Sequence, residues 1–161
     1  MKVDYINISK DNYNVFHGLL VSYYKDGEDK DTPQDIIDDF IKQLFDMIVK
    51  NKIQGRLISS DKKIIGFIIW MIDEEGSPYS MIPGYGTILE IGLIKDYRNK
   101  GIGKNIVEYA ENQMLEKGVN DFYITVYELA KIFWENCGYI NTGEVAFNGL
   151  YIYKKLKEIM N

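Results

Sequence analysis

Residues 98–104 read Arg-Asn-Lys-Gly-Ile-Gly-Lys, so three cations and two glycines stand three residues after the apolar run 87–94. Glycines at 101 and 103 would let successive backbone N–H groups converge at the start of a following helix, where the helix dipole also favours negative charge. Arg98 and Lys100 add positive charge to the segment. The pattern predicts a loop that binds an anion such as a pyrophosphate. An ordinary glycine-containing turn with surface cations is the alternative.

Two common phosphate motifs do not match this loop. A P-loop requires Ser or Thr after its Gly-Lys pair, but Asn105 follows Lys104, so the hydroxyl that binds magnesium is missing. A dinucleotide-binding fingerprint requires a third glycine, and Ile106 stands at that position. Both motifs are therefore excluded by residue type, and the loop alone leaves its own two interpretations open.

A second sequence pattern, downstream of the loop, favours the anion-binding interpretation over the ordinary turn. It consists of Ala130, Phe133, Trp134, Glu135, Gly138 and Tyr139. With the segment "LEIGLIKDYRNKGIGKNIVEYA", these residues resemble the GCN5-related N-acetyltransferase (GNAT) superfamily. That family combines Arg/Gln-x-x-Gly-x-Gly/Ala between a strand and a helix with a later Ala-x-x-Phe/Leu-Tyr-Glu-x-x-Gly-Phe/Tyr. The specific motifs cover residues 87–139, and the predicted element order fits the family over nearly the whole chain.

The resemblance implies a site for acetyl-coenzyme A as co-substrate, without a metal. In the family the glycine loop cradles the pyrophosphate, and the preceding strand pairs with the pantetheine arm. The residues implied to bind acetyl-CoA here are Leu93, Ile94, Arg98, Asn99, Lys100, Gly101, Ile102, Gly103, Lys104, Ala130 and Phe133.

Acetyl transfer to an amine first requires that an ammonium group lose a proton, with a pKa of about 10.4 if the amine is lysine-like. Glu90 is the only carboxylate in the apolar segment 87–94, at a position where many family members carry an acidic residue. We expect Glu90 to deprotonate or position the amine, directly or through a water. A carboxylate that faces solvent or forms a salt bridge is the alternative.

Two further catalytic roles follow from the resemblance. The backbone N–H of Leu93 is implied as the donor to the developing oxyanion. Trp134 stands where the family carries a general-acid tyrosine, and an indole N–H cannot supply a proton at neutral pH. Tyr127, Tyr139 or a water could replace it, and the sequence does not choose among them.

The function indicated is an N-acetyltransferase that moves an acetyl group to a small-molecule or peptide amine by direct attack. A non-catalytic module that binds or senses acyl-CoA is the alternative, because the general-acid tyrosine is missing. Transfer of a longer acyl group is a third hypothesis. Family members are often dimers, so a homodimer is compatible with the resemblance.

Composition narrows the class of protein. The 161 residues are 46% hydrophobic, enough for one domain over residues 1–161. A net charge of −5 argues against nucleic-acid binding, and one cysteine with one histidine argues against a zinc site or a disulfide framework. The longest apolar stretch, 64–72, is too short to span a bilayer, and the N-terminus lacks an apolar signal-peptide core. We expect a soluble, cytoplasmic protein.

Hydrophobic spacing predicts the elements that must position these residues. Strands are expected at 3–8, 53–60, 63–73, 87–94 and 121–127, with two more between 139 and 156 around a turn at 147–149; helices are expected at 12–24, 33–50, 102–117 and 129–137. Together with the resemblance, they predict an α/β (α+β) fold: a mixed, mostly antiparallel sheet of about seven strands with a splayed parallel pair, flanked by about four helices.

Several side chains receive structural interpretations. Thr32 is expected to cap the second helix, and Glu111 to lie on the outer face of the third. Cys137 is expected to be a buried core residue rather than a nucleophile. No partner is evident for His17, and the acidic segment 26–31 reads as a solvated loop that could face a cationic acceptor.

Overall fold

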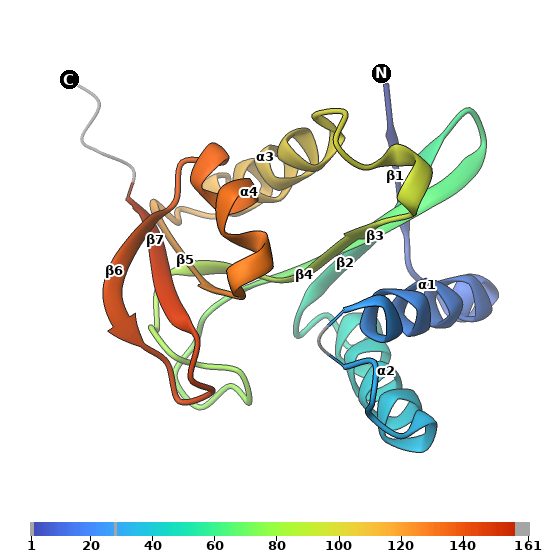
Figure 1. Cartoon of the computed structure of the whole chain (residues 1–161), viewed down its shortest axis with the longest axis horizontal. Coiled ribbons are helices and arrows are strands. Elements are labelled where there is room, and N and C mark those ends of the chain that lie inside the picture. The colour runs from blue at the N-terminus through green and yellow to red at the C-terminus, as the bar shows by residue number, and fades with distance from the viewer. Residues whose placement is uncertain (1, 28, 157–161) are drawn as a thin grey trace. The chain divides into compact units, whose positions relative to one another are not determined.

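The computed structural model describes residues 2–27 and 29–156 (Figure 1). The strands are β1 Asp4–Asn7, β2 Gln54–Ser60, β3 Lys63–Ile72, β4 Gly86–Leu93, β5 Asp121–Val126, β6 Ile140–Val145 and β7 Tyr151–Leu156. The helices are α1 Tyr13–Asp26, α2 Gln34–Val49, α3 Ile102–Leu115 and α4 Lys131–Asn136, with short 3-10 turns η1 Lys10–Asn12, η2 Lys95–Tyr97 and η3 Glu128–Ala130. The predicted element order is confirmed.

The strands form one seven-stranded mixed sheet in the order β1-β2-β3-β4-β5-β7-β6. β4 and β5 run parallel, with Gly86 opposite Phe122 and Thr87 opposite Tyr123, and the other neighbouring strands are antiparallel. The connection between β4 and β5 contains α3, because two parallel strands need a long crossover. The predicted fold class is therefore confirmed.

The chain divides into two compact units, which are described separately below. The N-terminal unit comprises Met1–Ile69 and Glu90–Gly103, and the C-terminal unit comprises Trp70–Leu89 and Lys104–Asn161. Strands β3 and β4 and helix α3 contribute residues to both units. One domain over 1–161 stays a prediction.

In the N-terminal unit, α1 and α2 lie side by side (Figure 1). Their apolar residues recur every three or four positions, so each helix buries one stripe, which contains Phe16 and Leu20 of α1 and Ile37, Ile41, Leu44 and Phe45 of α2. His17 Nε2 lies 2.7 Å from Asp38 Oδ1 and links the two helices. No local pattern revealed this partner, because Asp38 belongs to the next helix.

The start of α2 corrects one sequence prediction. Pro33, not Thr32, directly precedes the first helical residue, and its extended ψ of 143° turns the chain into the helix. Thr32 donates its hydroxyl to Asp29 Oδ1 at 3.4 Å instead of capping the helix. The carbonyl oxygen of Pro33 accepts the first helical hydrogen bonds, from the N–H groups of Ile36 and Ile37.

The hairpin between β2 and β3 places a nearly continuous apolar strand within the sheet. Asp61 and Lys62 both adopt positive φ, at 49° and 66°, as a two-residue hairpin turn with primed geometry requires. Most of β3 is buried, as expected of an interior strand. A Cβ at Gly66 of β3 would collide with the carbonyl oxygen of Gly92, so glycine is needed where β3 meets β4.

In the C-terminal unit, α3 buries Ile106, Val107, Ala110 and Met114. A Cβ at Gly86 would lie 2.5 Å from Met114 Sδ and 2.8 Å from Phe122 Cδ1, so the glycine at the start of β4 permits this packing. The helix ends at Leu115, two residues earlier than predicted, and Gly118 (φ +91°) reverses the chain after it.

Glu111 of α3 is buried rather than on the outer face, which corrects its predicted position. The Tyr139 hydroxyl donates to Glu111 Oε2 at 2.8 Å, and Lys155 Nζ donates to Oε1 at 2.9 Å. Lys155 also donates to the carbonyl oxygen of Cys137 at 2.9 Å. Glu111 follows Val107 by one helical turn, so it borders the apolar stripe, and its two donors allow a charged group to be buried there.

Candidate functional site

The predicted site residues belong to both units. The N-terminal unit contains Glu90, Leu93, Ile94, Arg98, Asn99, Lys100, Gly101, Ile102 and Gly103. The C-terminal unit contains Lys104, Tyr127, Ala130, Phe133 and Trp134. The N-terminal unit contains the candidate base, the glycine loop and a cavity, so we begin there.

Glu90 lies near the middle of β4 and contacts two adjacent tyrosines of α1. The Tyr24 hydroxyl donates to Glu90 Oε1 at 3.2 Å, and the Tyr23 hydroxyl also hydrogen-bonds to this carboxyl group. Glu90 keeps some solvent exposure, but the restricted hydration of its carboxyl group raises its pKa to about 7. The two tyrosines oppose this rise, and the negative charge of Asp29 adds to it. A carboxyl group with this pKa is about half ionised at neutral pH.

Aromatic contacts fix both tyrosines. The Tyr24 ring is 7% exposed and contacts the edge of the Phe40 ring of α2 at 5.7 Å between centroids. The Tyr23 ring contacts Phe67 of β3 at 5.4 Å, with the two planes at 89°. Sequence analysis did not identify these tyrosines as partners of Glu90. The only local signal was that the two tyrosines are adjacent. Two successive helical residues cannot both lie at the centre of one apolar stripe, so one of them had to point toward a different neighbour.

Gly92 allows α1 to approach β4 closely. A Cβ at this position would lie 2.7 Å from Phe67 Cε1 and 2.9 Å from Tyr23 Cδ1. These distances are shorter than any relaxed contact, so a larger residue would displace the Tyr23 ring. The small residue two positions after Glu90 thus helps to hold the tyrosines against the strand.

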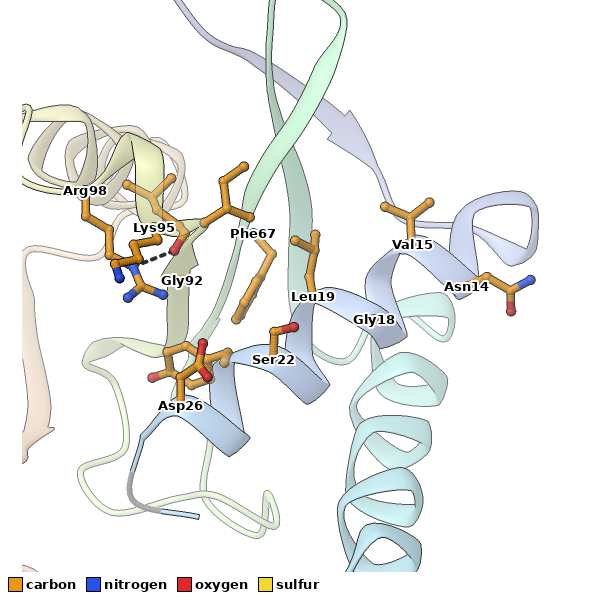
Figure 2. Close-up of a pocket in the computed structure, with 13 residues that line it drawn as sticks. Asn14, Val15, Gly18, Leu19, Ser22, Asp26, Phe67, Gly92, Lys95 and Arg98 are labelled. Atoms are coloured by element: carbon orange, nitrogen blue, oxygen red, sulfur yellow. Dashed lines mark hydrogen bonds between the residues drawn. The ribbon is translucent and has the colours of Figure 1, made fainter. Parts of the chain in front are cut away.

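A cavity of about 430 Å³ lies between α1 and the end of β4 (Figure 2). Its lining comprises Asn14, Val15, Gly18, Leu19, Ser22, Tyr23 and Asp26 of α1, Phe67 of β3, and Gly92, Leu93, Ile94, Lys95 and Arg98. The structure thus brings three predicted site residues, Leu93, Ile94 and Arg98, to one cavity. Its wall is mostly apolar, and Asp26, Lys95 and Arg98 provide charges of both signs.

Arg98 folds back over the end of β4. Its Nε donates to the carbonyl oxygen of Leu93 at 2.8 Å, as Figure 2 shows, which orients the guanidinium group beside the cavity. The backbone N–H of Ile94 donates to the carbonyl oxygen of Ile65 at 2.8 Å and ties this end of β4 to β3. These two hydrogen bonds hold Leu93, Ile94 and Arg98 in place at the end of β4.

The backbone of the glycine loop differs from the prediction in one respect. Asn99 and Gly101 adopt positive φ, at 61° and 79°, whereas Gly103 is already in the first turn of α3, which begins at Ile102. The residue that joins Gly101 in curling the backbone is therefore Asn99. The first N–H groups of an α-helix have no acceptor within the helix, and the residues just before α3 are exposed. Binding of a phosphate by this loop stays a prediction.

In the C-terminal unit, Trp134 is buried between two rings. Its indole contacts the edge of Phe133 at 5.0 Å and of Tyr139 at 5.3 Å between centroids. The Tyr139 hydroxyl donates to Glu111. Burial, and to a lesser extent the negative charge of Glu111, raises the pKa of Tyr139. Tyr127 is 43% exposed, and its carbonyl oxygen accepts the N–H of Ala130 at 2.9 Å. Tyr139, one of the two tyrosines that the sequence left as proton donors, thus commits its hydroxyl to a carboxylate.

The segment 74–85 of the C-terminal unit is anchored by a residue that sequence analysis missed. Asp73 is 1% exposed and accepts hydrogen bonds from the Ser80 hydroxyl at 2.5 Å and from the N–H groups of Met81 and Ile82. The Tyr123 hydroxyl of β5 donates to the same carboxylate at 2.5 Å. Burial opposes ionisation, but these donors together hold the pKa of Asp73 below its usual value.

Other chemistries find less support among the described residues. Residues 2–27 and 29–156 contain no group of three or more His, Cys, Asp or Glu side chains suited to a metal ion. No helix in this part of the chain has both the length and the apolarity needed to cross a membrane. Cys137 is buried as predicted, and burial raises the pKa of its thiol to about 11, which disfavours the nucleophilic thiolate.

Comparison with solved structures supports the fold. PaiA N-acetyltransferase from Thermoplasma acidophilum in complex with coenzyme A is 19% identical, with a TM-score of 0.74, and the match covers 97% of this chain and 99% of that one. An acetyltransferase from Thermus thermophilus is 16% identical, with a TM-score of 0.74 and 97% of both chains covered. The microcin C7 self immunity acetyltransferase MccE in complex with acetyl-CoA and AMP is 17% identical, with a TM-score of 0.66 and coverage of 96% and 92%.

A chimera of the spermidine N-acetyltransferase SpeG from Vibrio cholerae and hSSAT is also similar, at 13% identity, a TM-score of 0.69 and coverage of 98% and 96%. No curated protein matches the sequence. The model of the acetyltransferase (GNAT) family matches residues 14–139, which include all but the first residue of α1, the glycine loop and the motif around Trp134. The chain belongs to the acetyltransferase (GNAT) family.

Proposed function

We propose that the protein is an acetyl-CoA-dependent N-acetyltransferase in which Glu90 is the general base. The observation that carries this proposal is the position of Glu90 on β4, which leads through η2 to the glycine loop, with the Tyr24 hydroxyl donating to its carboxyl group; its raised pKa of about 7 supports the role. A general base is most effective when its pKa lies near the working pH. An ordinary surface carboxylate would be fully ionised and too weakly basic for this role.

The acetyl-CoA site is proposed to begin at the glycine loop. N–H groups of residues 99–103, together with Arg98, Lys100 and the following Lys104, would hold the pyrophosphate. Leu93 and Ile94 would pair with the pantetheine arm, and Ala130 and Phe133 would contribute further contacts. The positive φ of Asn99 and Gly101 and the helix N-terminus beside them support this assignment. Solved relatives that hold CoA or acetyl-CoA support the choice of ligand.

In the proposed reaction, the Glu90 carboxylate accepts a proton from the substrate ammonium, directly or through a water. The amine nitrogen then attacks the thioester carbon and forms a C–N bond, while the backbone N–H of Leu93 stabilises the oxyanion. Collapse breaks the C–S bond, and the second amine proton leaves toward the thiolate or solvent. The net products are an amide, free CoA and one proton.

The departing thiolate needs a proton from a group other than Trp134 or Tyr139. Trp134 cannot supply a proton, and the Tyr139 hydroxyl is engaged by Glu111. We propose the exposed Tyr127 or a water as the donor. A thiol of pKa about 8.5 is a tolerable leaving group without full protonation, so the reaction does not depend absolutely on an acid.

The acceptor is proposed to be a small-molecule or peptide amine whose substituent occupies the cavity beside α1. The relatives include a spermidine N-acetyltransferase, which gives one acceptor class to test. The homodimer and the cytoplasmic location stay predictions.

The test is release of CoA thiol from acetyl-CoA in the presence of a panel of primary amines. With the best acceptor, we expect Glu90→Gln to lower kcat/KM by about 10²–10⁴-fold while the Kd for acetyl-CoA stays within about twofold. Glu108→Gln is the matched control, because Glu108 is exposed on α3. Equal turnover of wild type and Glu90→Gln would remove Glu90 from the mechanism.

A non-catalytic acyl-CoA-binding or sensing module is the second candidate function. The burial of Trp134 at the position of the general acid, together with the engagement of Tyr139, favours it. The same thiol-release assay separates the two functions. Acetyl-CoA bound tightly by calorimetry, without turnover on any acceptor, would support the sensor.

A further inference from the structure

We infer that Tyr24 is a positioning residue, whose buried phenol orients the Glu90 carboxyl group and keeps it available in its ionised form. The inference rests on the proposed role of Glu90 as the base. It adds that α1, a helix outside the glycine-loop motif, controls when and how that base acts.

The geometry of Tyr24 leaves its hydroxyl little freedom. The ring is 7% exposed and is held by edge contacts with Phe40 at 5.7 Å and with Tyr23 at 5.2 Å between centroids. From this fixed ring the hydroxyl donates to Glu90 Oε1 at 3.2 Å. A buried donor in a fixed orientation can hold a carboxyl group in one rotamer, so Tyr24 defines where the base presents its other oxygen.

The charge balance at Glu90 explains why this donor matters. Burial disfavours the carboxylate, and Asp29, in the connection between α1 and α2, disfavours it further by charge repulsion. Tyr23 and Tyr24 favour the carboxylate, since a phenol O–H stabilises the charged form that accepts it. Burial and the Glu90 charge raise the pKa of Tyr24 itself, so Tyr24 stays a neutral donor. Among the described residues, the titratable groups that act on Glu90 are Tyr23 and Tyr24 of α1 and Asp29 of the α1–α2 connection.

The two tyrosines differ in their surroundings. Tyr23 lines the cavity beside α1, so a bound ligand can displace or occupy its hydroxyl. Tyr24 is absent from the cavity lining, and its ring packs against α2. Tyr24 is therefore the permanent donor, and its removal should affect Glu90 in free and ligand-bound protein alike.

The main experiment is the pH dependence of kcat/KM for wild type and Tyr24→Phe. The variant keeps the ring and its contacts but removes the hydroxyl, so the ionisation of Glu90 should move by about one pH unit toward alkaline pH. At pH 6.5, kcat/KM should fall roughly five- to tenfold, and at high pH it should recover to within about twofold of wild type. Tyr13→Phe is the control, because Tyr13 is also on α1 and packs its ring against Phe45 at 4.6 Å; its profile should match wild type.

A titration by ¹³C NMR of the glutamate carboxyl carbons tests the same contact without turnover. Loss of one signal in Glu90→Gln assigns Glu90, and this signal should titrate at higher pH in Tyr24→Phe than in wild type. If Glu90→Gln keeps full turnover, the proposed function fails, while the NMR shift still reports on the contact. If Glu90→Gln is inactive but Tyr24→Phe leaves both the pH profile and the NMR titration unchanged, the positioning role of Tyr24 is refuted.

Discussion

The Tyr139 hydroxyl donates to the buried Glu111 carboxylate at 2.8 Å, and the ring that this bond fixes packs edge-on against Trp134. The bond joins α3 to the segment that follows α4. Burial is the larger cause of the raised pKa of Tyr139, and the contact with Glu111 raises it further. The single O–H of Tyr139 is donated to Glu111. Trp134, which the sequence predicts at the general-acid position, therefore packs against a tyrosine whose own proton is engaged.

The first prediction follows from this arrangement. If Trp134 occupies the place of the acid, Trp134→Tyr restores a hydroxyl at a position already supported by Phe133 and Tyr139. We expect kcat with the best amine acceptor to rise about tenfold or more, because general-acid assistance contributes about 10²–10⁴-fold when it is well placed. The measurement is pre-steady-state thiol release. A kcat at or below that of wild type would mean that the thiolate leaves without help from this position.

Stability tests the ion pair beneath the same rings. Lys155→Met removes one of the two donors to buried Glu111 and should lower the free energy of unfolding by about 1–3 kcal/mol, less than for a fully buried pair because the lysine is 33% exposed. Urea denaturation at neutral pH measures the change. Lys42→Met is the matched control, since the Lys42–Asp46 pair on α2 is exposed on both sides and should contribute little. Equal losses in the two variants would contradict the importance of burial at Glu111.

Gly18 provides a steric test of the cavity. A Cβ at Gly18 would meet no heavy atom within 4 Å, and the residue is inside α1, so Gly18→Ala should stabilise the protein by about 0.5–1 kcal/mol without loss of activity. Gly18→Phe should instead fill the cavity that Gly18 lines. We expect its KM for the acceptor to rise about tenfold or more, and its KM for acetyl-CoA to rise by a smaller factor, because Leu93, Ile94 and Arg98 line the same cavity. A rise only in the KM for acetyl-CoA would reassign the cavity to the coenzyme.

The sequence predicted the elements of this fold because their signals are local. The alternation in β1, the stripes of α1 to α3 and the glycines at 101 and 118 each lie within a few residues of the structure they produce. Glu90 and Arg98 could be identified as candidate site residues for the same reason. An acidic residue in an apolar strand and a cation before a glycine stand out in the sequence even when their partners are unknown.

The missed residues share a different property, which is that their partners lie far away in sequence. Tyr24 acquires its role from Glu90, Glu111 from Lys155, and Asp73 from Tyr123. A helical pattern shows which face of α3 is apolar, but it cannot show that a distant lysine will make the edge of that face suitable for a buried carboxylate. Gly103 illustrates the local limit: glycine permits a positive φ but does not require it, and Asn99 adopts one instead.

The last prediction concerns the stability cost of the proposed base. The folded-state pKa of Glu90, about 7, lies above its ordinary value of 4.5, so folding favours the protonated form. The contribution of Glu90 to stability is therefore fully present below about pH 4.5 and is lost as the pH rises through 7. Glu90→Gln stays neutral and can still accept the Tyr24 hydrogen bond through its amide oxygen, so it avoids this loss.

We therefore expect Glu90→Gln to gain stability relative to wild type between pH 5 and pH 8, while its acetyl transfer falls. The full pKa difference corresponds to about 3 kcal/mol at most, and the partial exposure of Glu90 reduces the expected gain to about 1–2 kcal/mol. Urea unfolding of both proteins at the two pH values measures it, and Glu108→Gln controls for the loss of one negative charge. A difference between Glu90→Gln and wild type that does not change with pH would mean that Glu90 ionises at its ordinary pKa, and the main argument for its role as a base at neutral pH would then be lost.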